Sequence, residues 1–394
     1  MRVRPTHHPT RRLVPVTIRS TAAAAALAAV ALPLSAQSAN WQPLGTLTGA
    51  SPAVVAPVDP NLPQYRVGAG DTRFNGVVRI IMNRTDGTFV CSGSVLNNGN
   101  RQVILSAAHC FTNALGANNT TSVTVEYRSA QTGALIQSRT TAGSNVFIRS
   151  GYNGSVVNQR DVAVINLGIG NGFTDATIRG YDLFQGASFA GTTVNLAGYG
   201  ATGNGITGAV GGAQTWMRWG QNRFETSCGN AVSVASCAGT RAGNPSNNVN
   251  TQGGVIIGDF DDPTNAIPNN DSQLCFFTNI CTGAVGGTPG EVNIGGGDSG
   301  SAAFIASSQE ILGVASFGSR RIDITPIPPF GAFNTSFGYA CVANITGNAE
   351  CQGNFAFVNS VLAAAVIPEP STYALMATGL VGLAGVARRR NKKS

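Results

Sequence analysis

Three short segments place a histidine, an aspartate and a serine in settings suited to nucleophilic catalysis. His109 follows the apolar stretch 103–108 and is the only histidine left once the first 39 residues are removed. The end of a rigid strand would hold its imidazole as a general base, which must meet a hydroxyl within hydrogen-bond reach. Asp161 opens the apolar run 162–165, where a carboxylate at the rim of a core needs a donor such as a ring N–H.

The serine lies in a glycine-rich segment. Residues 295–301 read Gly-Gly-Gly-Asp-Ser-Gly-Ser, with the candidate nucleophile at Ser299. Glycines permit a tight turn with positive φ, and such a turn directs successive backbone N–H groups toward an oxyanion that forms beside the serine oxygen. Taken singly, the three segments have bland alternatives: a structural histidine, a turn aspartate at a strand end and an ordinary glycine-rich loop.

Short β-strands are expected to position these residues. Only 11% of the 394 residues are charged and 50 are glycine, against about 25% charged in a typical soluble domain. This composition excludes a coiled coil, a long-helix bundle and a charged disordered chain, and it favours strands joined by tight turns. Strands are predicted at 77–82, 88–96, 102–106, 121–128, 161–167, 192–197, 301–305 and 311–316. A short helix over 358–365 is predicted to end the domain.

The positive charge of the chain belongs to its ends. The formal net charge is +7, but five basic residues lie in the first 19 positions and five more in the last seven. The rest of the chain is close to neutral, so it lacks the basic surface expected of a nucleic-acid-binding protein.

Residues 1–39 have the organisation of a cleavable secretory signal. A basic region ends at Arg19, the apolar run 21–34 follows, and small residues at 35–39 offer sites for signal peptidase. An apolar run of about 14 residues is short for a bilayer span, so a membrane anchor is the weaker alternative. Residues 40–66 contain five prolines and are predicted to be a linker or propeptide.

Export to an oxidising compartment favours disulfides over free cysteines. They number eight and fall in four couples that are near in sequence, which in an oxidising compartment predicts four disulfides. The couples are Cys91 with Cys110, Cys228 with Cys237, Cys275 with Cys281, and Cys341 with Cys351. Metal binding by these cysteines is the alternative, but no C-x-x-C spacing supports it, and we expect neither a metal ion nor a cofactor.

Residues 366–394 carry a second targeting signal. Pro-Glu-Pro at 368–370 precedes the apolar stretch 373–387, and a basic cluster follows at 388–393. A hydrophobic helix of this length is at the lower limit for a membrane span, with the basic cluster on the cytoplasmic side. The three-part order resembles the PEP-CTERM sorting tail of Gram-negative bacteria. The resemblance implies cleavage by an exosortase-type enzyme, only transient membrane contact, and release or attachment at the cell surface; a permanent anchor is the alternative.

Residues 67–365 together resemble the trypsin-like, chymotrypsin-fold serine peptidases. The order His109, Asp161, Ser299 is that family's order, and supporting segments fall in matching places at 91–96, 196–200, 312–318 and 353–358. The resemblance implies an all-β domain of two six-stranded antiparallel β-barrels with a short C-terminal helix. It also implies a triad in which Ser299 is the nucleophile, His109 the general base and acid, and Asp161 the orienting carboxylate.

Further roles follow from the same resemblance. The backbone N–H groups of Gly297 and Ser299 would form an oxyanion hole. Ser316 would hydrogen-bond the triad aspartate, and Ser316, Phe317 and Gly318 would pair with an extended peptide substrate by strand addition.

The resemblance also locates a specificity pocket. Asn293, six residues before Ser299, would form its floor, and Gly318 and Gly353 would lie on its walls. An uncharged floor offers no ion-pair partner to arginine or lysine, so a medium or large uncharged substrate side chain is expected.

The expected activation step and two local features complete the prediction. In many relatives a released amino terminus pairs with the aspartate before the nucleophile, which would here be Val67 pairing with Asp298 after cleavage at Arg66. Residues 221–290 are predicted to contain an insertion, because Asp161 and Ser299 are 138 residues apart. The acidic run 259–262 has the ligand chemistry for calcium but lacks the loop spacing, so a solvated turn is expected there.

The sequence therefore predicts a secreted serine endopeptidase that acts on proteins or peptides. Two alternatives from other classes stay open, namely an inactive or adhesive surface protein on the same scaffold and a structural component of the exopolysaccharide matrix. The complete set of catalytic residue types favours the enzyme, because a binding module has no need for all of them.

Overall fold

The structure is a computed structural model that describes part of the chain. The described residues are 54–56, 63–205, 208–210, 212–228, 253–261, 291–318, 335–366, 378–381 and 383. The predicted signal 1–39 and most of the sorting tail 366–394 lie outside them. No helix within these ranges is long and apolar enough to cross a membrane.

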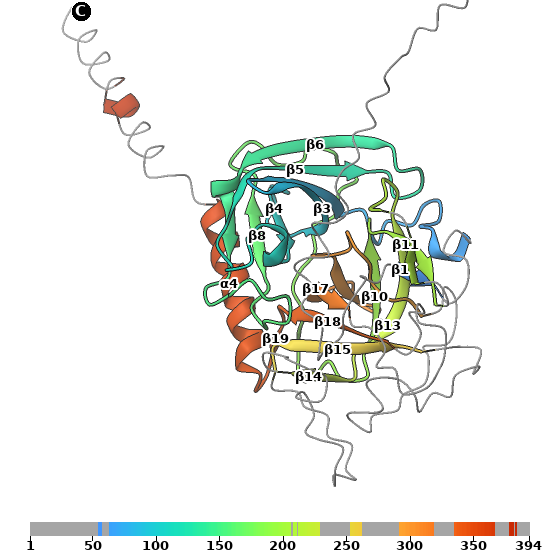
Figure 1. Ribbon diagram of the computed structural model, residues 1–394. Coiled ribbons are helices and arrows are strands. Elements are labelled where there is room, and N and C mark those ends of the chain that lie inside the picture. The colour runs from blue at the N-terminus through green and yellow to red at the C-terminus, as the bar shows by residue number, and fades with distance from the viewer. Residues whose placement is uncertain are drawn as a thin grey trace, which may run out of the picture. The chain divides into compact units, whose positions relative to one another are not determined.

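The first half of the domain is a seven-stranded antiparallel sheet in the order β6-β5-β2-β3-β4-β8-β7. Its strands are β2 (Val77–Arg84), β3 (Gly87–Val95), β4 (Val103–Ser106), β5 (Thr120–Arg128), β6 (Leu135–Ala142), β7 (Val146–Ile148) and β8 (Ala163–Asn166). Strands β5 and β6 form one long edge of this sheet (Figure 1).

The second half is another seven-stranded antiparallel sheet, in the order β13-β10-β16-β17-β18-β15-β14. Its strands are β10 (Thr193–Gly198), β13 (Arg218–Arg223), β14 (Thr226–Cys228), β15 (Val255–Phe260), β16 (Ala302–Ile305), β17 (Ile311–Gly318) and β18 (Thr335–Cys341).

Smaller elements complete the described part of the chain. They are β1 (Val54–Ala56), β11 (Thr202–Asn204) and β12 (Gly208–Val210) in one small sheet, the pair β9 (Gln185–Gly186) and β19 (Asn344–Ile345), the 3-10 helices η1 (Pro63–Tyr65), η2 (Ala108–Cys110) and η3 (Gly143–Asn145), and helix α4 (Ala349–Val366).

The predicted all-β class with a C-terminal helix is confirmed, with two corrections. Each sheet has seven strands rather than six. The helix begins nine residues earlier than the predicted residue 358, because Asn348 caps it by accepting a hydrogen bond from Cys351 N–H at 3.0 Å.

All eight predicted strands are present, and prediction missed four strands of the second sheet but only β6 and β7 of the first. The predicted insertion 221–290 contains β14 and β15, so this segment contributes strands to the sheet itself. Strand β15 is buried at every position, and a strand buried on both faces shows no alternation of polar and apolar residues.

Buried side chains join the two sheets. One core cluster lies within the first sheet and one within the second. A third contains side chains from both, including Val103 and Val164 of the first sheet, Phe304 and Val314 of the second, and Val358 of α4. The halves therefore share a continuous core, and residues at their junction are held by both.

Two of the four predicted disulfides lie within the described side chains, and both are formed. Cys91 is bonded to Cys110, and Cys341 to Cys351.

The other two predicted disulfides fall outside what the structure describes. Cys237, Cys275 and Cys281 lie outside the described residues, and Cys228 is described only as the backbone end of β14. The pairing of Cys228 with Cys237 therefore stays a prediction, as does the pairing of Cys275 with Cys281.

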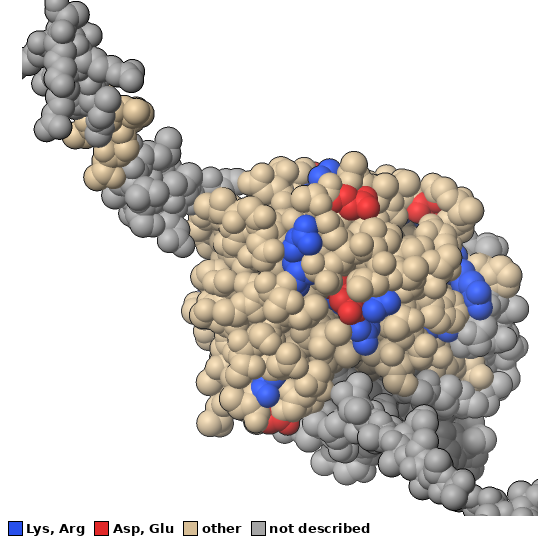
Figure 2. Space-filling model, turned by 90° about the horizontal axis from the view of Figure 1, so that it is seen from above, with Lys and Arg blue, Asp and Glu red and all other residues tan. Residues whose placement is uncertain are grey.

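The folded chain begins before the predicted boundary at Val67. Val54–Ala56 forms strand β1 and pairs in parallel with β11. Tyr65 and Val67 are both buried. Part of the segment 40–66 is therefore built into the structure instead of serving only as a linker. The face in Figure 2 carries few charged side chains, as the composition predicts.

Candidate active site

His109 and Asp161 form a two-point contact between η2 and the start of β8. The ring Nδ1 of His109 lies 2.7 Å from Asp161 Oδ2, and the backbone N–H of His109 donates to Oδ1 at 2.8 Å. Asp161 is completely buried. Because a carboxylate accepts, the ring proton lies on Nδ1, which leaves the lone pair of Nε2 available as a base.

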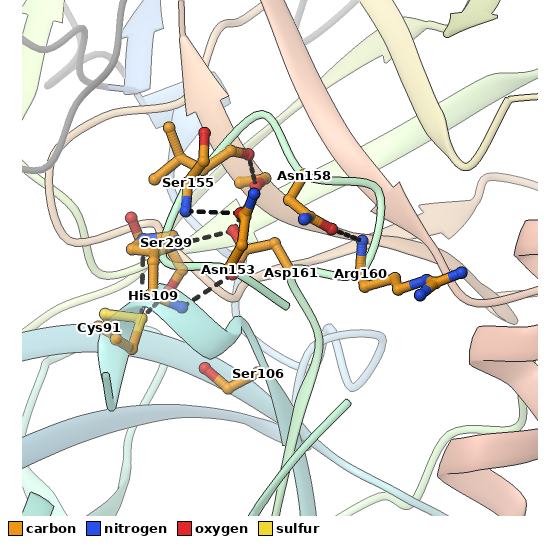
Figure 3. A network of polar contacts seen from close by, with 12 residues as sticks. Cys91, Ser106, His109, Asn153, Ser155, Asn158, Arg160, Asp161 and Ser299 are labelled. Atoms are coloured by element: carbon orange, nitrogen blue, oxygen red, sulfur yellow. Dashed lines mark hydrogen bonds and ion pairs between the residues drawn. A yellow bond between two sulfur atoms is a disulfide. The ribbon is translucent and has the colours of Figure 1, made fainter. Parts of the chain in front are cut away.

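A loop rich in turn-forming side chains delivers Asp161 (Figure 3). Asn153 Oδ1 accepts from Ser155 N–H at 3.1 Å, and Asn158 Oδ1 accepts from Arg160 N–H at 2.8 Å. The carbonyl of Asn158 also accepts from Asp161 N–H at 3.0 Å. These asparagine turns fix the backbone just before the aspartate, so the carboxylate has one orientation.

Two contacts hold the short helix that carries His109. The Cys91–Cys110 disulfide ties it to β3. Arg84 donates from Nη1 to the carbonyls of His109 at 3.3 Å and Cys110 at 3.5 Å. A guanidinium at a helix C-terminus pairs with carbonyls that lack helical partners. The imidazole is therefore mounted on a braced turn.

Tyr152 packs in the same region. Burial, together with the negative charge of Asp161, raises the pKa of Tyr152 far above that of a free phenol. The phenol therefore stays neutral beside the aspartate at every pH at which the protein is folded.

Ser299 lies in a turn that prepares two backbone donors. Gly297 has φ of +102°, a conformation that favours glycine, and a Cβ there would lie 2.8 Å from the Cβ of Ala213. The N–H groups of Gly297 and Ser299 have no acceptor among the residues that the structure describes. Two unpaired N–H groups beside a serine match the donor arrangement of an oxyanion hole.

Cys110 Sγ lies close to both His109 and Ser299. Cys110 Sγ lies 3.9 Å from His109 Nε2 and 3.8 Å from the carbonyl oxygen of Ser299. Figure 3 shows both side chains beside the Cys91 disulfide. Within the described part of the chain, no hydrogen bond joins the Ser299 hydroxyl to the ring, and such bonds often tighten only when substrate is bound.

The two halves of the site brace each other through two serines. Ser92 of β3 donates its N–H to the Ser299 carbonyl at 2.9 Å and its hydroxyl to the Gly297 carbonyl at 2.9 Å. Ser316 of β17 donates its hydroxyl to the Asp161 carboxylate. A serine of each sheet therefore holds a candidate catalytic segment of the other half.

Asp298 fixes the turn that carries Ser299 through hydrogen bonds to two backbone N–H groups. Its carboxylate is buried and accepts from Gly200 N–H at 2.7 Å and from Gly295 N–H at 2.9 Å. Any side chain at Gly200 would overlap this carboxylate. Burial, and then the charge of Asp298, raises the pKa of Tyr339. Pairing of a released Val67 amino group with Asp298 stays a prediction.

The residues predicted for substrate binding fall in two places. Ser316, Phe317 and Gly318 form the end of β17, and Asn293 is fully buried in the segment before the nucleophile turn. Gly353 does not fit the predicted pocket wall. It lies within helix α4, where the nearest atom to a Cβ would be Arg149 Nη2 at 3.0 Å, because the Asn348 cap starts the helix before it.

Sequence reasoning missed the roles of Ser92 and Arg84. Ser92 lies in the segment 91–96 that resembles the peptidase family, but a serine beside a second buried serine, Ser94, carries no signal of its own in the sequence. Arg84 is buried in the structure, and nothing in the sequence distinguishes it from the exposed arginines.

The comparisons with known proteins agree with a peptidase-like architecture of two antiparallel sheets and a C-terminal helix. Residues 66–194 match the family model of the lysyl endopeptidase C-terminal domain, and residues 366–390 match the PEP-CTERM protein-sorting motif. The predicted resemblance is thus confirmed. The chain is peptidase-like and carries an export and sorting tail. The first match includes His109 and Asp161 but ends before Ser299.

Two solved structures of proteases align with the chain at low identity. The protease Anisep from Arthrobacter nicotinovorans aligns at 15% identity with a TM-score of 0.44, covering 74% of this chain and 98% of its own. The thermostable serine protease AL20 from an extremophilic microorganism aligns at 10% identity with a TM-score of 0.44, covering 74% and 99%. No curated protein gives a sequence match.

Proposed function

We propose that the protein is a secreted serine endopeptidase that uses Ser299, His109 and Asp161 as a catalytic triad. The observation that carries this proposal is the paired contact of Asp161 with the ring and backbone of His109, next to a turn with two unpaired N–H groups. A binding protein gains nothing from orienting an imidazole in this way. The sorting motif supports export to the envelope or exterior of a Gram-negative-type cell, with a signal peptidase and an exosortase-type enzyme as processing partners.

Each group has a role in the proposed mechanism. His109 Nε2 takes the proton of the Ser299 hydroxyl as its oxygen attacks the scissile carbonyl carbon, and the N–H groups of Gly297 and Ser299 stabilise the resulting oxyanion. The same imidazole then returns the proton to the leaving amine. His109 then takes a proton from water as the water attacks the acyl-enzyme carbonyl. The proton passes to the Ser299 oxygen as the acid product leaves. Asp161 keeps the ring oriented and stabilises its protonated form.

The substrate side chain before the scissile bond is proposed to be uncharged. The matched family is named for lysine, but the expected pocket floor of this chain, Asn293, carries no charge. A cleavage-site profile on a peptide library measures the preference. We expect medium or large uncharged residues, and a strong lysine preference would contradict this assignment.

Covalent labelling with an organophosphonate tests the mechanism. We expect the secreted protein to be labelled at Ser299 and the His109→Ala variant to lose labelling, because the hydroxyl is then no longer activated. The Ser94→Ala variant, which changes a buried serine of strand β3, should label like the parent protein. Correctly processed protein that resists labelling and cleaves no peptide would favour the adhesive or matrix role.

A further inference from the structure

Three buried carboxylates meet at the end of β15, away from the triad. Asp259 and Asp261 come from this strand end, and Glu291 comes from the segment that leads to the nucleophile turn. Their carboxylate oxygens all lie within 4.8 Å of one another. The residues are exposed by only 1%, 1% and 4%. The expected solvated turn is therefore wrong for Asp259 and Asp261; Asp262 lies outside the described residues.

Hydrogen bonds to the backbone hold the two segments together. Asn222 of β13 donates from Nδ2 to the carbonyls of Asp259 at 2.9 Å and Val292 at 2.8 Å. Val292 N–H donates to the carbonyl of Gln221 at 2.9 Å, and Asp261 N–H donates to Glu291 Oε2 at 3.3 Å. These bonds bring the three acidic side chains to one place.

Asp261 is the member of the cluster whose carboxylate has no compensating partner among the described residues. Among the described residues, both of its carboxylate oxygens are buried without a hydrogen-bond partner, and no ion pair involves it. An ionised carboxylate in such a place is costly unless a cation compensates it.

We propose that Asp259, Asp261 and Glu291 bind a calcium ion. Carboxylate oxygens are the ligands that hard divalent cations prefer, and calcium accepts six to eight oxygens in flexible geometry at about 2.3–2.6 Å. Magnesium demands a near-ideal octahedron and retains water, and zinc favours nitrogen and sulfur ligands. Export places the protein where calcium sites of modest affinity, with Kd of about 10⁻⁴–10⁻³ M, are occupied.

The ion would link β15 to the segment that carries the catalytic serine. Glu291 lies two residues before Asn293 and eight before Ser299. The ion therefore ties a strand of the second sheet to the approach of the nucleophile turn. The proposal concerns stability and ligand binding, so it does not depend on the proposed catalysis.

Calcium titration of the full chain as secreted, carrying Ser299→Ala to prevent autolysis, tests the site. After chelation and desalting, we expect calorimetry to show one calcium ion bound per chain, and thermal unfolding to show a higher Tm in calcium chloride. Asp261→Asn and Glu291→Gln, two substitutions that conserve shape, should each weaken calcium binding at least tenfold. Asp182→Asn, at an exposed aspartate, should bind calcium like the parent.

Three outcomes would overturn the proposal. The first is an absence of both heat and Tm shift up to millimolar calcium. The second is a calcium response that is equal in the parent and in both cluster variants. The third is a cleavage pattern, measured in protein with intact Ser299. If this protein strongly prefers lysine, if Asp261→Asn loses the preference and if chelation does not change it, the cluster would bind a substrate ammonium group and not calcium.

Discussion

The two sheets treat a buried acidic group in opposite ways. In the first, Glu126 of β5 accepts from Arg79 Nη1 at 2.9 Å and from Arg128 Nε at 2.8 Å. Burial alone would raise its pKa, but the bonds from Arg128 and Arg79 outweigh burial and lower it. In the second, Asp261 has no such partner among the described residues, and its pKa is raised to about 8.

The contrast indicates which half needs an added cation to compensate its buried carboxylates. The first sheet neutralises the carboxylate of Glu126 with its own arginines, and it carries His109 and Asp161, the base and orienting acid of the proposed triad. The second carries Ser299 and the proposed oxyanion donors, and it leaves a carboxylate cluster for the proposed cation. The proposed catalytic unit therefore forms only where the two halves meet, through Ser92 and Ser316.

The largest expected effect comes from removing the catalytic residue of either half. His109→Ala and Ser299→Ala should each lower kcat by about 10⁶, because the base and the nucleophile act as one unit. The double variant should lose no more than either single variant. Steady-state kinetics on one peptide substrate measures this, with Tm as the control for folding. Additive losses would show that the two halves act separately.

The next effect concerns the serines that cross between the halves. Ser92→Ala removes the hydroxyl that holds the Gly297 carbonyl, so the oxyanion donors lose their fixed position. We expect kcat to fall by about 10–100-fold, with KM nearly unchanged, because misplaced groups cost mainly transition-state stabilisation.

Ser94→Ala is the matched control for Ser92→Ala. Ser94 is equally buried in the same strand, but its hydroxyl has no hydrogen-bond partner within the described part of the chain. Its loss should leave kcat within about twofold of the parent, since no oxyanion donor depends on it. Equal losses in the two variants would mean that packing in β3, and not the Ser92 hydroxyl, sets the turn.

Exchanging carboxylates for amides should change stability in opposite directions in the two sheets. Glu126→Gln should destabilise by about 1–3 kcal/mol at pH 7, because two guanidinium groups lose their charged acceptor. In chelator at pH 8, Asp261→Asn should stabilise, because a buried charge disappears. Denaturant unfolding compares both with Glu310→Gln, at a glutamate whose carboxylate accepts only from the Ser308 hydroxyl among the described residues.

The Glu126 effect has a defined pH window. Its folded pKa is lowered, so the stability it adds is present above the pKa of about 4.3 of an unfolded glutamate and is lost as the pH falls through the folded value. The difference between the parent and Glu126→Gln should therefore shrink in acid. A difference that stays constant down to pH 2 would contradict the two-arginine site.

The sequence was sufficient where a local pattern carries the information. Strands of the first sheet such as β2 and β3 have turn residues at both ends, and the triad residues stand in order with distinctive neighbours. Strand β15 was missed because full burial removes alternation. Both β15 and β18 also contain a glycine, which in sequence resembles a turn.

Contacts between distant segments were beyond prediction. Ser92 and Gly297 are 205 residues apart, and serine is too common to mark such a contact. Asp261 and Glu291 are separated by 30 residues, so nothing in the acidic run indicated that a third carboxylate would join it. Such pairings depend on strand register, which only the folded sheets fix.

The smallest expected effect concerns cleavage after Arg66. If a released Val67 amino group were needed at Asp298, Arg66→Gln would leave the uncleaved protein nearly inactive. The structure gives Asp298 two backbone donors in the uncleaved chain, and Arg66 contributes a backbone carbonyl to Trp219 that glutamine retains. We therefore expect kcat/KM to change less than about threefold, well under the effect of one lost oxyanion donor. N-terminal sequencing of the assayed protein shows whether it was cleaved. A loss above 100-fold in uncleaved protein would establish that the second half needs the new terminus as well as a cation.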